Sequence, residues 1–213
     1  MLLQNCDVIE LTKSEKRLEV AKEAARLLYY GLATEYIFAK KRAARSLRIR
    51  PLPSNKEVAL ELNNLADSLE GEEERKKRLV EFRKEAYRYM RLLEQFCPIL
   101  KGSVWRGTIT KRSDIDIVIY SSDFSQPLAV LNEQQIHPEV QYNTRQNGSI
   151  SKTYVHLIFV TPLGINVEIV IRTPEEQGIR ETCEIFGDII KGFTLSELES
   201  VLKEDPTMKF LPD

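Results

Sequence analysis

The stretch Lys101-Gly-Ser-Val-Trp-Arg-Gly-Thr-Ile-Thr-Lys-Arg-Ser-Asp-Ile-Asp-Ile-Val-Ile-Tyr120 decides the fold of this 213-residue chain. Its second half has the period of a strand, in which successive side chains point to opposite faces. Asp114 and Asp116 therefore lie side by side, and the isoleucines between and after them point the other way. Two such carboxylates repel one another unless a cation lies between them, and their oxygens suit Mg²⁺. The pattern predicts a divalent metal site.

A glycine–serine pair lies ten residues before these aspartates. Gly102 and Ser103 follow the short apolar run 98–100 and are expected to open a short helix. Backbone N–H groups and a hydroxyl at such a position can hold a phosphate. Taken alone, the pair fits an ordinary turn, and the aspartates fit the solvated face of a strand. Together with Gly107 at this spacing, they indicate the metal and triphosphate site of a nucleotidyl-transfer enzyme.

These motifs resemble the signature of the DNA polymerase β-type nucleotidyltransferase superfamily. The Gly-Ser-x-x-Arg-Gly-Thr run at 102–108 is similar to the catalytic core of archaeal CCA-adding tRNA nucleotidyltransferases. The spacing also fits poly(A) polymerase relatives and small antitoxin-type nucleotidyltransferases. The resemblance covers about 97–172 and implies an α+β fold, with a mixed β-sheet core flanked by helices. It also implies a nucleoside triphosphate substrate such as ATP and two Mg²⁺ ions, which Mn²⁺ can replace.

The resemblance implies a third carboxylate on a later strand. The segments 154–160 and 165–172, joined by a Pro/Gly turn, predict a β-hairpin, and Glu168 is the acid inside its second strand. Burying an acid there is costly unless it is paired or binds metal. The alternative is a solvated face shared with Asn166. Many relatives carry aspartate at this position, so glutamate is a departure. We assign Asp114, Asp116 and Glu168 as catalytic residues and metal ligands.

Several cations lie near these motifs and could assist the departing pyrophosphate. They are Lys101, Arg106, Lys111, Arg112 and Arg172. The sequence does not rank them. We assign Gly102, Ser103, Arg106 and Lys111 to nucleotide binding.

The first half of the chain is predicted to be helical. Capping boxes at Thr12–Glu15 and Ser54–Glu57 each predict a helix start. Three-four spacing of apolar residues predicts a first helix from Glu15 to about Leu47, a second over 56–69, and a third from about Glu72 to Phe96 after Gly71. We expect an α-helical N-terminal unit over 1–96, a catalytic core over 97–172 and a C-terminal helical extension over 173–213.

The predicted first helix carries a run of cations without an acid. Its members are Lys40, Lys41, Arg42, Arg45, Arg48 and Arg50. Such a run can neutralise a nucleic-acid backbone, so RNA is a candidate partner. The alternative is a solvated helix face, which is the commoner meaning of a charge run.

Composition sets the outer bounds of the interpretation. With 42% hydrophobic and 30% charged residues, the chain has the composition of a globular protein, and its net charge of −1 excludes a globally basic nucleic-acid binder. No stretch approaches the roughly 20 apolar residues that span a bilayer, and the start lacks a signal-peptide pattern. We expect a cytoplasmic protein with no membrane partner. Cys6, Cys97 and Cys183 lack zinc-site spacing and are expected to be reduced.

The remaining segments are assigned from local patterns. A short helix is expected over 127–135, a strand over 139–142 and a polar loop over the site at 143–152. Capping boxes at Thr173–Glu176 and Thr194–Glu197 predict two helix starts. His137 and His156 are assigned no role.

These observations predict a Mg²⁺-dependent nucleotidyltransferase that moves a nucleoside monophosphate to an acceptor hydroxyl, with RNA as the favoured acceptor. The alternatives are a small-molecule or protein acceptor, or a non-catalytic RNA-binding or scaffolding protein with the same fold. The sequence indicates neither the base preference nor the oligomeric state.

Overall fold

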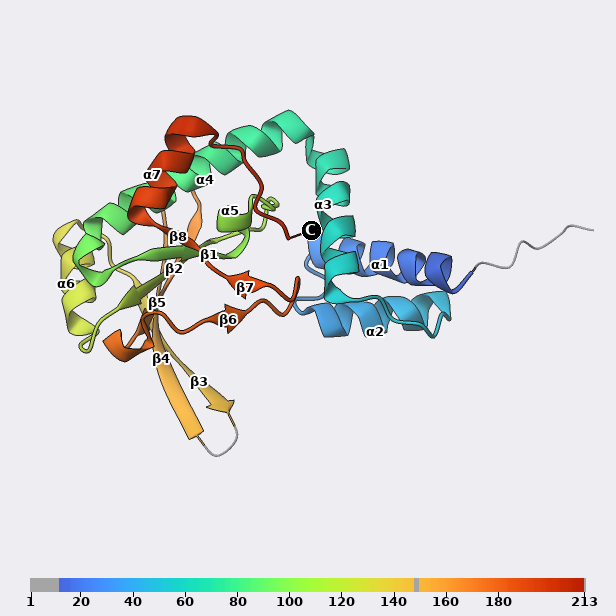
Figure 1. Cartoon of the computed structure of the whole chain (residues 1–213), viewed down its shortest axis with the longest axis horizontal. Helices are drawn as coiled ribbons and strands as arrows, with labels where there is room; N and C mark the ends of the chain where they lie inside the picture. Colours follow the sequence, from blue (N-terminus) through green and yellow to red (C-terminus); the bar gives the residue numbers. More distant parts are fainter. Residues whose placement is uncertain (1–11, 148–149, 213) are drawn as a thin grey trace, which may run out of the picture. The chain divides into compact units, whose positions relative to one another are not determined.

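A computed structural model describes residues 12–147 and 150–212 of the chain (Figure 1). The chain divides into two compact units. The helical unit contains the described residues up to Leu69 together with Glu184–Phe186, and the sheet unit contains Glu70–Cys183 and the chain from Gly187 onward. The expected division at 96/97 therefore differs from this one, because the helix Glu72–Leu92 lies in the sheet unit.

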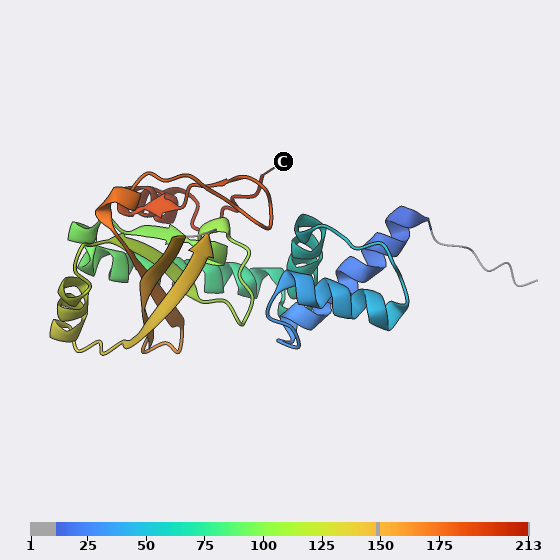
Figure 2. The same cartoon turned by 90° about the horizontal axis from the view of Figure 1, so that it is seen from below.

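The helical unit is built from α1 (Lys13–Tyr29), α2 (Tyr36–Leu47) and α3 (Asn55–Glu70), whose last residue falls in the sheet unit. Both predicted capping boxes are formed: the Glu15 N–H donates to Thr12 Oγ1 over 3.3 Å, and the Ser54 N–H donates to a Glu57 carboxylate oxygen over 2.7 Å. Fully buried alanines on α1 and α2 let the two helices pack closely (Figures 1 and 2).

The prediction of one helix from Glu15 to Leu47 is wrong. The chain leaves α1 after Tyr29 and re-enters a helix at Tyr36. Gly31 adopts φ +66, a left-handed conformation that a helix interior cannot contain. The basic run therefore lies on α2 and the segment after it, where Arg48 forms the left-handed C-cap.

The sheet unit is built on a six-stranded mixed sheet. Its strands are β1 (Ile99–Lys101), β2 (Ile115–Tyr120), β3 (Glu139–Asn147), β4 (Ile150–Val160), β5 (Asn166–Arg172) and β8 (Phe193–Thr194). The order is β3-β4-β5-β2-β1-β8, with β2 and β5 parallel and the other pairs antiparallel. A separate ribbon pairs β6 (Glu181–Thr182) with β7 (Ile189–Ile190). The predicted α+β class is confirmed.

The helices α4 (Glu72–Leu92) and α7 (Leu195–Glu204) pack against one another and against the apolar face of this sheet. The sheet unit also contains α5 (Gly102–Arg106), α6 (Ser125–Glu133) and 3₁₀ turns at Glu94–Phe96 and Pro174–Glu176. Ile117 of β2 and Ile169 of β5 are fully buried in one core with Phe82 of α4. The opposite face of β2 carries the aspartates. In the described ranges, no helix is long and apolar enough to cross a membrane.

The loop expected over 143–152 is in large part a hairpin. β3 continues to Asn147 and β4 begins at Ile150, so the ladder extends well past the predicted strand end (Figure 1). Thr144 and Thr153 face one another across it with their hydroxyl oxygens 2.9 Å apart. Of the cysteines, Cys97 and Cys183 are free thiols, as expected, and Cys6 lies outside the described residues.

Candidate active site

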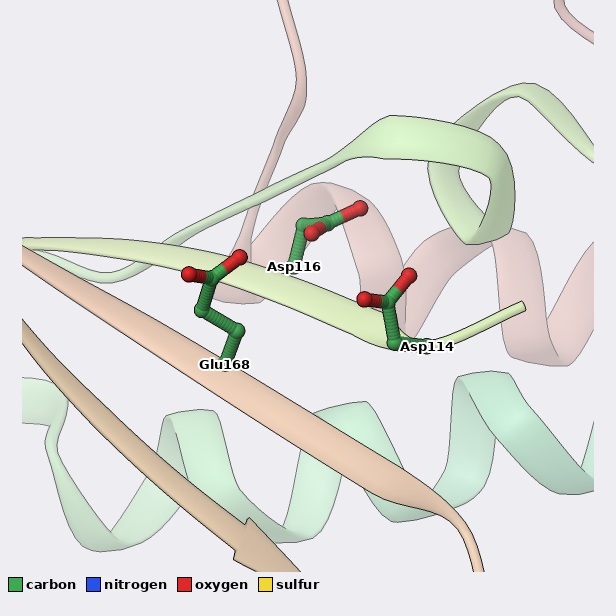
Figure 3. Close-up of side chains that lie close together, drawn as sticks. All are labelled: Asp114, Asp116 and Glu168. Atoms are coloured by element: carbon green, nitrogen blue, oxygen red, sulfur yellow. The ribbon is translucent and has the colours of Figure 1, made fainter. Parts of the chain in front are cut away.

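Three carboxylates meet on the polar face of the sheet (Figure 3). Asp116 belongs to β2 and Asp114 directly precedes that strand, whereas Glu168 comes from β5. The parallel pairing of β2 with β5 places Asp116 opposite Glu168 in register. One oxygen of each side chain lies within 4.8 Å of the others. The structure thus brings together the three acids predicted from the sequence, and we call them the acidic triad.

Burial and neighbouring negative charge disfavour the ionised forms of the two aspartates in the acidic triad. Burial, together with the negative charges of Asp114 and Glu168, raises the pKa of Asp116 to about 7. Burial also raises the pKa of Asp114, with Glu168 contributing. A divalent cation would relieve this repulsion, and hard carboxylate oxygens suit Mg²⁺ or Mn²⁺. The donor set fits the metal that the sequence predicted.

Gly102 holds the backbone directly against Asp116. It adopts φ +68, and a Cβ built on it would lie 1.8 Å from Asp116 Oδ2. Only glycine fits such a position, because any side chain would collide with the carboxylate and strain the backbone. The predicted short helix is present as α5, with Gly102 and Ser103 as its first residues. The glycine–serine pair therefore begins α5 beside the acidic triad.

One buried arginine on α4 donates hydrogen bonds to the backbone of α5. Arg83 is fully buried and donates to the carbonyls of Val104 and Trp105 over 3.2 and 3.0 Å, and to those of Pro206 and Met208. Burial lowers the pKa of Arg83 to about 10, so it stays charged at neutral pH. Sequence reasoning missed this residue. Its signal was a cation at the spacing of the apolar residues of α4, where a solvated side chain is not expected.

His156 contacts the third acid. Its Nδ1 lies 2.6 Å from Glu168 Oε1, and only 8% of the residue is exposed. His156 pairs with Val170 across β4 and β5, so Glu168 is its diagonal neighbour on the same face. The sequence analysis gave His156 no role. The register of the predicted hairpin was the signal that could have placed it.

The predicted nucleotide-binding cations occupy different surroundings. Arg106 is 5% exposed; it donates to Asp188 over 2.7 Å and to the Phe210 carbonyl over 3.1 Å, and stacks 4.4 Å from the Trp105 ring centre. Arg106 thus has partners within the chain, and its assignment to nucleotide binding stays a prediction. Lys111 is exposed in the turn before β2, where its backbone N–H donates to Glu70.

The six cations predicted to contact RNA lie in the helical unit. Lys40 donates to Asn55 over 2.7 Å, and Arg42 donates to the Leu32 carbonyl over 2.8 Å. The side chains of the other four are exposed, namely Lys41, Arg45, Arg48 and Arg50.

The segment that carries the acidic triad has a counterpart among known protein families. Residues 99–190 match the family model of the nucleotidyltransferase domain. The matched segment runs from β1 to β7 and includes Gly102, Ser103 and all three acids. This segment is less than half of the chain, and the match does not single out the CCA-adding enzymes. A comparison with curated proteins gave no match.

Proposed function

We propose that this chain is a divalent-metal-dependent nucleotidyltransferase that moves a nucleoside monophosphate from a triphosphate to an acceptor hydroxyl, with RNA as the acceptor. The observation that carries the proposal is the acidic triad itself. Asp116 and Glu168 come from two parallel strands in register, and Asp114 directly precedes the first of them. The three acids lie within 4.8 Å of one another and belong to the segment that matches the nucleotidyltransferase domain.

The residues of the site supply positioning and charge. Asp114, Asp116 and Glu168 would hold the metal. When bound, such a metal lowers the pKa of an attacking hydroxyl and neutralises the triphosphate. Gly102 and Ser103 would hold phosphate oxygens through backbone N–H groups and the hydroxyl. Phosphoryl-type transfer needs little covalent chemistry from the protein. The role of the strands would be to hold these groups in fixed positions.

Label transfer tests this function. Each radiolabelled nucleoside triphosphate is incubated with Mg²⁺ and a pool of RNA, protein and metabolites. Asp114→Asn and Asp116→Asn are expected to abolish transfer and to leave the fold intact. The control is Asp123→Asn, an exposed aspartate beyond the end of β2 whose carboxylate accepts hydrogen bonds from Ser125 in its own turn. Transfer at the wild-type rate by either active-site variant would refute the assignment.

The choice of RNA is supported by the exposed cations of the helical unit. Arg50 also lines a hollow of about 470 Å³ with Lys13, Lys16 and Pro51, so further cations lie beside the run. A polyanion could bind such a surface by releasing counterions, and its affinity would then depend on salt.

A triple variant tests the RNA assignment separately. Changing Lys41, Arg45 and Arg48 to glutamine should weaken RNA binding and flatten the slope of log affinity against log salt by roughly 0.7 to 0.9 for each lost phosphate contact. The control changes three exposed lysines elsewhere, Lys77, Lys84 and Lys203. If the triple variant keeps the parent's affinity and slope, a small-molecule or protein acceptor becomes the better assignment.

A further inference from the structure

One carboxylate in the sheet unit is bound by two cations at once. Arg172 donates to Glu181 Oε1 over 2.7 Å, and Lys101 Nζ contacts the other oxygen, Oε2. The three side chains are largely buried, with exposed fractions of 13%, 28% and 15% for Arg172, Glu181 and Lys101. The cluster therefore holds two positive charges and one negative charge away from bulk water.

The two cations belong to the sheet face that carries the acidic triad. Lys101 is the register partner of Asp116 on the neighbouring strand and directly precedes Gly102. Arg172 follows Glu168 on β5 at a spacing that returns to the same face. A group held between Lys101 and Arg172 thus lies over the same face as the predicted metal ligands.

The Glu181 carboxylate does not use every hydrogen-bond donor of Lys101 and Arg172. Arg172 Nε is buried and has no hydrogen-bond partner among the described residues. Burial opposes ionisation of Glu181, but the hydrogen bonds from Arg172 and Lys101 outweigh it and hold the pKa of Glu181 below its ordinary value. A carboxylate offers two oxygens and one charge, whereas a pyrophosphate unit offers more of both. Arginine suits such bidentate recognition of phosphate.

We infer that Lys101 and Arg172 form the subsite for the β- and γ-phosphates of the nucleotide, and that the Glu181 carboxylate occupies this subsite until a polyphosphate displaces it. The inference rests on the proposed function and ranks the cations that the sequence left unranked. Glu181 belongs to β6, which makes only two register pairs with β7. So short a ribbon can shift at low cost, and the carboxylate can also leave by side-chain rotation alone.

Calorimetric binding of pyrophosphate tests the subsite without any acceptor or turnover. Glu181→Gln removes the competing charge and is expected to bind pyrophosphate several-fold more tightly than the wild type. Lys101→Gln and Arg172→Gln each remove a charge-assisted contact and are expected to bind it about ten- to a hundredfold more weakly. Arg172→Lys should fall between. The control is Glu175→Gln, an exposed acid on the nearby turn.

A comparison of ATP with AMP shows whether the subsite binds the β- and γ-phosphates of the nucleotide. The lysine and arginine variants should lose affinity for ATP and keep that for AMP, which lacks the β- and γ-phosphates. If Glu181→Gln binds pyrophosphate no more tightly and melts at a lower temperature, the cluster is only a structural ion pair and the inference is wrong. Failure of the wild type to bind pyrophosphate also overturns it. Binding that follows the expected order without any label transfer refutes the proposed function and leaves the subsite standing.

Discussion

Replacing Gly102 by alanine would place a methyl group where the Asp116 carboxylate now lies. The built Cβ is 1.8 Å from Oδ2, whereas real contacts of this kind are at least 3.0 Å, so the carboxylate must retreat by 1.2 Å, the difference between the two. Metal–ligand distances tolerate about 0.2 Å. We therefore expect Gly102→Ala to weaken Mn²⁺ binding at least tenfold and to abolish transfer.

The chain offers a matched control for the backbone strain. Gly164 adopts φ +77 with nothing near its Cβ position, so Gly164→Ala carries the left-handed cost alone. That cost is about 1–2 kcal/mol, and each kcal/mol lowers Tm by about 2–4 °C in a chain of this size. Both variants should melt lower than the wild type, and only Gly102→Ala should lose the metal.

Mn²⁺ titration followed by electron paramagnetic resonance measures the binding, and thermal melting measures the strain. If Gly102→Ala binds Mn²⁺ as tightly as Gly164→Ala does, Asp116 can move aside without cost. The close approach of α5 to the acidic triad then has no bearing on metal binding.

Three further outcomes are expected of the acidic triad. The pKa of Asp116 is about 7 in the folded state and near 4 in the unfolded state. Between about pH 4 and about pH 7 the folded state therefore binds more protons than the unfolded state does. The metal-free protein should lose stability as pH rises from about 4 to about 7. Urea unfolding across this range should show the slope, and Asp116→Asn should reduce it. His156→Gln should lower metal-dependent transfer about 10- to 100-fold, because the contact with Glu168 is lost. The control His137→Gln, at an exposed site, should not change the rate. If the two variants transfer at equal rates, His156 is not part of the site. Glu168→Gln should reduce turnover more than nucleotide binding, and Glu168→Asp should keep part of it; unchanged turnover in steady-state kinetics of Glu168→Gln would mean that another acid, or none, is the third ligand.

Local signals were enough to predict several elements of the fold. The capping boxes and the break at Gly71 depend on neighbours a few residues apart, so the sequence carries them directly. The break at Gly31 was hidden because apolar spacing continues through it from α1 into α2. The long β3–β4 hairpin was hidden because polar residues dominate β3, which leaves no clear apolar alternation there.

Some residues of the candidate site could likewise be predicted from local patterns, and others could not. Asp114 and Asp116 were found from the period of one strand. Glu168 was found from a hairpin pattern and a resemblance. The partners of these groups depend on pairings between distant strands and helices, so the contacts of His156 and Glu181 emerge only from the folded chain.

The parallel pairing of β2 with β5 makes the metal site a product of the whole sheet. Asp116 and Glu168 are separated along the chain by α6, β3 and β4, so they meet only after a long loop has closed. An unfolded chain has no such site, and a divalent ion would bind the native state alone. By linkage, an ion at 100 times its Kd would add about 2.7 kcal/mol to the free energy of unfolding. The concentration of divalent ion in the surroundings would then shift the equilibrium between the folded and the unfolded chain.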